Sequence, residues 1–160
     1  MGLPEGWKIA SLLEAKGYGL ALGIEPVRLK DSFHFECVQT GECCQHPDAQ
    51  PNGCTHFHSV GTIKWEKKQG IWRCPKLEGE NVCTIHPERP LTCRLFPLGI
   101  SMVRQARRVV VWKFKAPQRC LPCYDQPRRW TVMSWLAHCG FWDRIGPLCE
   151  QMDREGSVEL

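Results

Sequence analysis

Residues 74–97 read CPKLEGENVCTIHPERPLTCRLFP and space three cysteines between turns. Cys74, Cys83 and Cys93 are separated by nine and ten residues, which lets the chain fold back and present three thiolates to a common point. Two prolines between the last two cysteines prevent a long helix there. The spacing is not that of two Cys-x-x-Cys knuckles, so it identifies no particular metal. The alternative is three buried structural cysteines.

The stretch FECVQTGECC, residues 35–44, adds three more cysteines, two of them adjacent. Side chains of adjacent residues point to opposite faces of a strand and diverge by about 100° in a helix. We therefore expect Cys37 and one of Cys43 and Cys44 to reach a centre with the cysteines of residues 74–97. Residues 33–61 are rich in Cys, His, Gly and Pro and lack hydrophobic periodicity, so something other than apolar burial must hold them, and a metal can do so.

Cysteine is the unusual residue of this chain, with eleven in 160 residues. The N-terminal residues resemble neither an export signal nor a transmembrane span, so we expect a cytoplasmic protein with no membrane span. Thiols stay reduced in that compartment, where clustered cysteines are more often metal ligands than disulfides. The net charge of 21 − 17 = +4 comes from short, scattered basic tracts. These indicate a solvated surface and do not indicate nucleic acid as a partner.

Local sequence patterns predict a single domain over residues 33–160, preceded by an irregular or partly helical lead-in over residues 1–32. Two short strands are expected around KKQG, with Trp65 and Trp72 as apolar anchors. RRVVVWKFKA, residues 107–116, alternates as a half-buried strand does.

The C-terminal part predicts helices. One begins near Thr131, and a second, short helix covers residues 146–155 with Pro147 near its first turn. The fold class is therefore small α+β: a loop-rich, metal-stapled cysteine core with a short antiparallel sheet and C-terminal helices.

The cysteine pattern resembles the YkgJ-type cysteine-cluster family, which is described as zinc- or iron-chelating. The family pattern is similar to F-x-C-x-x-C-x-x-C-C, then C-P-x-L, then C-x-I-[YH]-x-x-R-P-x-x-C-R-x-[FY]-P. The matching positions are Phe35, Cys37, Cys43, Cys44, Cys74, Pro75, Leu77, Cys83, Ile85, His86, Arg89, Pro90, Cys93, Arg94, Phe96 and Pro97. Thr40 stands where the family has its second cysteine. The match covers roughly residues 33–100, and Cys120 with the later TVMSWL extends it to about residue 142.

The resemblance implies a metal-binding cysteine core, related in some members to flagellin lysine N-methylase, where an iron–sulfur cluster has been implicated. Because Thr40 removes one potential ligand, the site must use three thiolates or recruit another residue. The candidate metal ligands are Cys37, Cys43, Cys44, Cys74, Cys83, Cys93 and Cys120. They exceed the four that one centre needs, so either two sites exist or some cysteines only pack. An iron–sulfur cluster is slightly favoured over zinc because nearly every candidate is a cysteine.

Other polar residues have competing interpretations. Cys54, His56 and His58 form either a partial zinc site or a surface loop with chance histidines. We expect His86 to pack its ring or form a hydrogen bond rather than bind metal. Arg89 and Arg94 either neutralise a thiolate cluster or bond to turn carbonyls.

Two further sets of cysteines complete the inventory. Cys120 and Cys123, in CLPC, are interpreted as a knuckle lending a thiolate to a metal rather than as a redox dithiol. Cys139 is expected in the core, and Cys149 is unassigned.

The leading functional hypothesis is a small metal-binding protein, iron–sulfur or zinc, for electron transfer or metal handling. One alternative is an accessory subunit of a larger complex, with the metal as a staple and Trp135 and Trp142 on an apolar docking surface. Another is a redox or methyl-transfer accessory enzyme related to the methylase, an idea that depends on the resemblance alone. Whether the protein is an enzyme stays open.

Overall fold

The structure is a computed structural model and describes residues 2–12, 24–37, 45–47, 59–60, 63–79, 82–114, 121–158 and 160. The strands are β1 (Lys8–Ser11), β2 (Ile24–Glu25), β3 (Ser32–His34), β4 (Gln45–Pro47), β5 (Ser59–Val60), β6 (Ile63–Lys64), β7 (Glu66–Lys68), β8 (Ile71–Arg73), β9 (Leu77–Glu78), β10 (Val82–Cys83), β11 (Leu98–Val103), β12 (Arg108–Phe114) and β13 (Arg129–Thr131). The helices are α1 (Leu91–Leu95), α2 (Leu121–Tyr124), α3 (Val132–His138), α4 (Phe141–Glu155) and a 3₁₀ turn, η2 (His86–Glu88).

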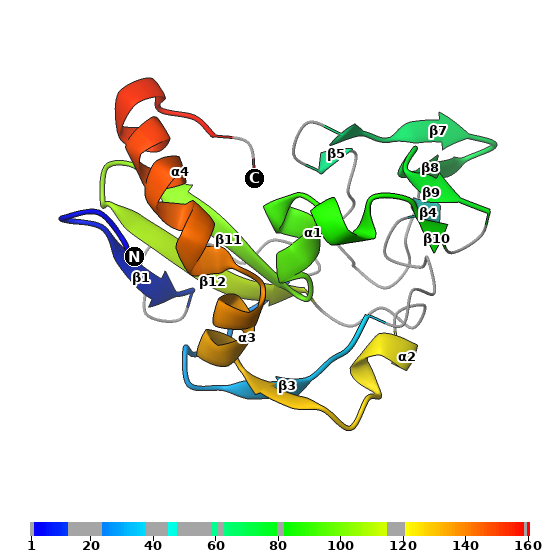
Figure 1. Ribbon diagram of the computed structural model, residues 1–160, viewed down its shortest axis with the longest axis horizontal. Coiled ribbons are helices and arrows are strands. Elements are labelled where there is room, and N and C mark those ends of the chain that lie inside the picture. The colour runs from blue at the N-terminus through cyan, green and yellow to red at the C-terminus, as the bar shows by residue number, and fades with distance from the viewer. Residues whose placement is uncertain are drawn as a thin grey trace.

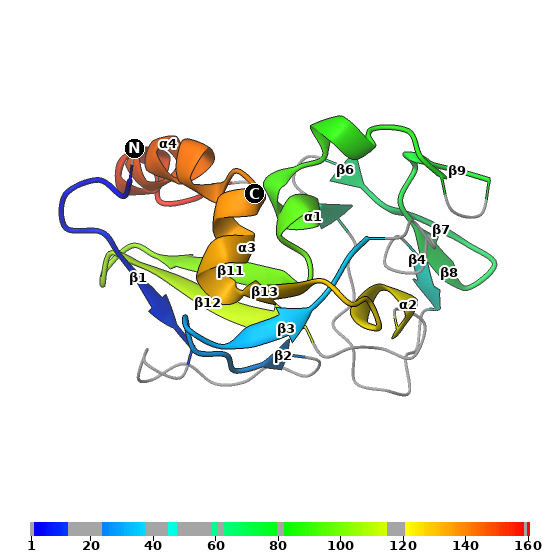
Figure 2. The ribbon, with the colours of Figure 1, turned by 60° about the horizontal axis from the view of Figure 1, so that its bottom comes forward.

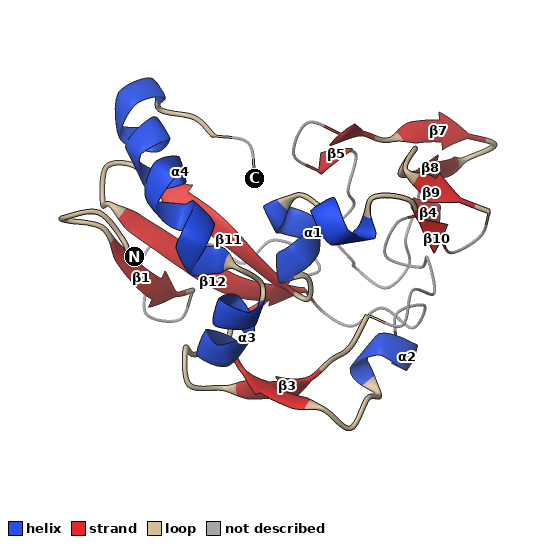
Figure 3. Ribbon diagram, in the orientation of Figure 1, coloured by secondary structure: helices blue, strands red, loops and turns tan. Residues whose placement is uncertain are grey.

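Strand β12 is the centre of the main sheet. It pairs with β11 in antiparallel and with β1 in parallel orientation, and its end pairs with β2 (Figure 3). The strand predicted over residues 107–116 is confirmed, but the expected half-buried alternation is wrong, because Val109, Val110 and Val111 are each at most 1 % exposed. A central strand has neighbours on both edges, and side chains on both faces of β12 are covered, so alternation gives way to a continuous buried run.

The predicted lead-in contributes to this sheet. Lys8–Ser11 form β1 rather than the expected helical turn, because the backbone pairs with β12 over Lys8↔Arg108 to Ser11↔Val111. Trp7 is buried in the main core, and its Nε1 donates a hydrogen bond to Asp153 Oδ2 on α4 at 3.0 Å. The division of the chain at residue 32 stays a prediction.

Helix α3 begins where the sequence predicts. Thr131 is its N-cap: the Thr131 hydroxyl accepts from the Ser134 backbone N–H at 3.0 Å, and the Ser134 hydroxyl accepts from the Thr131 N–H at 2.9 Å. This reciprocal pair satisfies N–H groups that have no partner within the helix.

Helix α4 is longer than predicted. It begins at Phe141, directly after left-handed Gly140, and Pro147 lies in its interior. Its buried residues, Phe141, Ile145, Cys149 and Met152, recur at helical spacing through the Gly-Pro step, and their burial outweighs the missing proline hydrogen bond.

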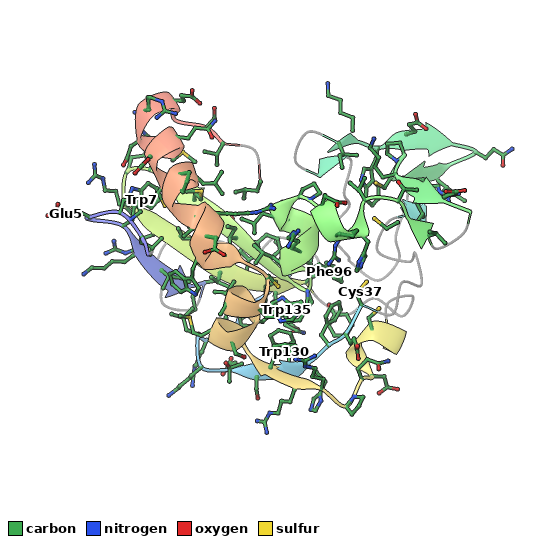
Figure 4. The ribbon with its side chains drawn as sticks, viewed as in Figure 1. Glu5, Trp7, Cys37, Phe96, Trp130 and Trp135 are labelled. Carbon is green, nitrogen blue, oxygen red and sulfur yellow. The ribbon has the colours of Figure 1, made fainter. Side chains whose placement is uncertain are left out.

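The main core lies between the sheet and these helices; α4 crosses one face of the sheet in both ribbon views (Figures 1 and 2). Aromatic side chains extend it toward β3 and β13. Trp135 meets Phe35 and Trp130 edge to face, with ring centroids 5.4 and 5.0 Å apart, and Phe96 lies next to them (Figure 4). Edge-to-face contacts of this kind add to the burial of the rings.

A second, much smaller unit comprises residues 63–89 and carries short hairpins. Strands β7 and β8 flank Gln69 and Gly70, whose φ angles of 52° and 76° fit the tight turn expected around KKQG. Trp65 is 6 % exposed, as predicted for an apolar anchor. The side chain of Trp72 lies outside the described part.

Helix α1 joins the two units and lies between them in both views (Figures 1 and 2). Leu91 and Leu95, one turn apart, are buried in the main core, whereas Cys93 packs against the cluster of Trp65 and Cys74. The chain end also returns here, because Thr92 N–H donates to the Leu160 carbonyl at 3.2 Å.

The predicted fold class is confirmed: short mixed sheets, extensive loops and C-terminal helices make a small α+β fold. Within the described residues, no helix has the length and apolar character needed to cross a membrane. The metal staple stays a prediction.

Candidate metal centre

The described part of the chain contains four of the seven candidate ligands: Cys37, Cys74, Cys83 and Cys93. The candidates that lie outside it are Cys43, Cys44 and Cys120, together with Thr40 and the possible partial zinc site of Cys54, His56 and His58. The choice between Cys43 and Cys44 therefore stays a prediction.

Cys74 and Cys93 are brought into one cluster. Cys74 follows β8 and is 8 % exposed in a cluster with Trp65, while Cys93, from α1, is partly buried and packs against this cluster. The turn after β8 fixes the first thiol, because Leu77 N–H donates to the Cys74 carbonyl at 3.1 Å. Two thiols from separate segments thus lie in one cluster with Trp65.

Cys83 belongs to the same unit and is partly buried at the end of β10. Its strand pairs with β9, where Cys83 is opposite Leu77. Thr84 ties the hairpin down, because its N–H and its hydroxyl both donate to the Lys76 carbonyl, at 2.9 and 2.7 Å. Cys74 and Cys83 therefore sit on opposite arms of a cross-linked hairpin.

A pocket of about 590 Å³ opens on this hairpin and has Cys74 in its wall. The Arg73 guanidinium beside it donates to the carbonyls of Leu77, at 3.2 Å, and Gly79. The lining residues are Glu66, Ile71, Arg73, Cys74, Pro75, Leu77, Glu78 and Gly79. The lining mixes one cation, two carboxylates and apolar surface, and Cys74 in its wall is 8 % exposed.

Cys37 lies in different surroundings. It packs against the main core, next to Phe96 and close to α2 (Figure 4). Glu36 N–H donates to the Cys123 carbonyl at 2.9 Å and holds this segment against α2. Among the described residues, no three His, Cys, Asp or Glu side chains are arranged to hold a metal ion. The set of seven metal ligands therefore stays a prediction.

Cys123 is buried in the main core at 4 % exposure. The last three residues of CLPC lie within the short helix α2, which ends at Tyr124. The packing of Cys123 is the structural contribution of this motif; Cys120 lies outside the described residues.

Arg89 and Arg94 donate hydrogen bonds to turn carbonyls. This is the structural role that the sequence analysis gave as an alternative to neutralising a thiolate cluster. Arg89 Nε donates to the His86 carbonyl at 2.8 Å. Arg94 Nε donates to the Arg89 carbonyl at 3.1 Å, and its Nη2 donates to the Pro87 carbonyl. The two guanidinium groups thus fix η2 to α1, the helix that carries Cys93.

The sequence analysis did not identify His86 as a possible metal ligand. Its Nε2 is buried and has no hydrogen-bond partner among the described residues, so the predicted hydrogen bond is not formed at that atom. Leaving a buried polar atom unpaired costs about 1–3 kcal/mol, which makes such atoms rare. The sequence signal was the spacing Cys83-x-x-His86, the separation at which ligand pairs recur in zinc sites.

Cys139 and Cys149 are core thiols rather than ligands. Cys139 Sγ donates to the Arg94 carbonyl at 3.0 Å, and burial raises the pKa of this thiol to about 12, against the opposing effect of Arg89 and Arg94. Burial, with the nearby carboxylates of Asp153 and Glu150, raises the pKa of Cys149 to about 11. Both thiols therefore stay protonated at neutral pH, whereas the form that binds a metal is the thiolate.

The prediction that Trp135 lies on an apolar docking surface is wrong. This residue is 7 % exposed, and its Nε1 donates to the Leu95 carbonyl at 2.8 Å, so its ring is committed to the core. Trp142 is partly buried against the same core.

In comparison with known proteins, residues 36–121 match the model of the CxxCxxCC family, which is described as "Putative zinc- or iron-chelating domain". The match includes all seven candidate ligands and more than half of the chain. No match is found among curated proteins or among solved structures.

Proposed function

Because the chain belongs to the CxxCxxCC family of zinc- or iron-chelating domains, we propose that it binds zinc or an iron–sulfur centre through the thiolates around α1. Cys74 and Cys93 provide the first two ligands. Cys83, Cys37, one of Cys43 and Cys44, and Cys120 are the candidates for the others. The metal fastens the loop-rich unit of residues 63–89 to the rest of the fold.

One observation carries this proposal: among the described residues, Cys74 and Cys93 share a small cluster whose other members are Trp65 and the partly buried Ile63. A cluster of this size buries little apolar surface with which to order the hairpins. Thiolate ligation supplies the missing free energy, because metal binding at a site absent from the unfolded chain is folding free energy.

The chemistry of the donors fits both metals. Zinc bound by thiolates acts as a structural staple, whereas an iron–sulfur cluster supplies a one-electron redox centre. Arg89 and Arg94, held between η2 and α1, place two positive charges beside the thiol-bearing helix and offset the negative charge of the ligands. A reducing compartment, the cytoplasm, is part of the proposal because the ligands must remain thiolates.

Metal and acid-labile sulfide analysis of anaerobically purified protein, with an ultraviolet–visible spectrum, tests this function. We expect stoichiometric zinc, or iron with sulfide and a visible band bleached by dithionite. Cys74→Ser should lose the metal, while Cys149→Ala, a buried thiol in the main core, should keep it. Protein with neither iron and sulfide nor stoichiometric zinc would contradict the proposal.

A further inference from the structure

We propose that His86 Nε2 is a ligand of the bound metal, so that the centre is a mixed thiolate–imidazole site. This inference rests on the proposed function, since it names one more donor of the same centre. In this site, the His86 imidazole would replace the thiolate that is missing because Thr40 stands at a cysteine position of the family pattern.

The unpaired nitrogen is the first observation. His86 Nε2 is buried, yet no described residue forms a hydrogen bond with it. A buried imidazole nitrogen needs a hydrogen-bond partner or, when it carries no proton, a metal ion. Imidazole nitrogen is a regular zinc ligand and is commonly combined with thiolates.

The second observation is that hydrogen bonds hold the backbone at His86 in place. Its carbonyl accepts from Arg89 Nε at 2.8 Å, and the Arg89 carbonyl accepts in turn from Arg94 Nε at 3.1 Å. Arg94 lies next to Cys93 on α1, so the backbone at His86 and the helix that bears Cys93 form one hydrogen-bonded unit. Metal ligands are held in this way before the metal arrives, which lowers the cost of ordering them.

The third observation is sequence position. His86 follows Cys83 by three residues, and Cys83 is on the hairpin that also carries Cys74. The described residues alone form no group of three donors, and the partners of His86 in the centre are the candidate thiolates of the proposed function. A nitrogen donor in this set favours zinc over an all-thiolate iron–sulfur cluster.

Cobalt titration of metal-free protein under anaerobic conditions tests the assignment, because cobalt reports its own ligands in the visible spectrum. In the His86→Gln variant we expect a cobalt and zinc affinity at least tenfold weaker and shifted d–d bands. In the His86→Cys variant we expect binding to return with a stronger thiolate-to-cobalt charge-transfer band. His34→Gln, at an exposed strand position, is the matched control and should titrate as the wild type does.

Each outcome decides a specific point. If wild type binds metal and His86→Gln gives the same affinity and spectrum, the inference is wrong and the proposed function stands. If His86→Cys behaves as His86→Gln does, with no added charge-transfer intensity, His86 is not a ligand. If wild type binds neither cobalt, zinc nor iron, the proposed function fails and the inference fails with it.

Discussion

The main core and the hairpin unit of residues 63–89 are built on opposite principles. The core packs Phe141, Leu136 and Val109, all fully buried, between a sheet and two helices. The hairpin unit has the Trp65–Cys74 cluster, and two large hydrophobic side chains in or beside it, Ile71 and Val82, are 44 % and 53 % exposed.

The difference teaches what the cysteines do in each region. In the core, Cys139 and Cys149 are protonated, buried and no more reactive than other apolar side chains. In the hairpin unit, Cys74 and Cys93 form a substantial part of the little that is buried. Burial of apolar surface holds the first region, and we attribute the order of the second to a metal.

The largest expected effect is in the core. Phe141→Ala removes a ring that is 0 % exposed and should lower the free energy of unfolding by roughly 3–5 kcal/mol. Chemical denaturation followed by near-ultraviolet circular dichroism measures this loss. The metal content of the folded fraction should not change; metal loss in this variant would mean that the two regions are not independent.

Removal of a thiol should separate the two regions. We expect Cys93→Ala to weaken metal affinity roughly a hundredfold, about 2.8 kcal/mol, because a ligand is lost. The matched change Cys149→Ala should leave the affinity unaltered. Competition titration with a chromogenic chelator compares the variants, and equal affinities would show that Cys93 is not a ligand.

A methyl group at Gly99 tests packing on the sheet. The Cβ of Gly99→Ala would lie 2.3–2.6 Å from the Trp112 ring, which must move. We expect a loss of about 1–3 kcal/mol by denaturation. Gly146→Ala is the control: its nearest neighbour would be the Gly2 carbonyl at 3.6 Å, and it lies within α4. That variant should be stabilised by roughly 0.5–1 kcal/mol, and two similar losses would refute this interpretation.

The core thiols should also make stability depend on alkaline pH. Burial raises the pKa of Cys139 from 9.0 to about 12 and that of Cys149 to about 11. The unfolded chain then loses these protons near pH 9 while the folded chain keeps them, so stability is full below pH 9 and falls above it. The slope is at most about 1.4 kcal/mol per pH unit for each thiol. Denaturation from pH 8 to 11 should show this fall in wild type and a shallower one in Cys139→Ala; equal slopes would contradict it.

The sequence predicted features that local residues encode. The turn at Gln69 and Gly70, the helix start at Thr131 and the α+β class are examples, because turn and capping preferences act within a few residues. The pairing of β1 with β12 was not predicted, since it joins segments 100 residues apart and leaves no local pattern. The predicted helix over residues 146–155 is shorter than α4, because Gly146 and Pro147 are typical of a helix boundary. In the structure, the buried side chains on both sides of this pair keep the helix continuous.

The candidate site was predicted by residue type but not by arrangement. The cysteine spacing singled out Cys74 and Cys93 as ligands, which stays a prediction, yet nothing in it indicated that they would share one cluster with Trp65. The unpaired Nε2 of His86 was equally hidden, because a hydrogen-bond deficit exists only once the chain is folded.

Hydrogen–deuterium exchange of the metal-loaded and the chelator-stripped protein tests the central claim most directly. On removal of the metal, we expect amide protection to be lost in residues 63–89 and to persist in β12, α3 and α4, because apolar burial holds those elements without it. Equal protection of residues 63–89 in both forms, or a uniform loss throughout the chain, would contradict the account.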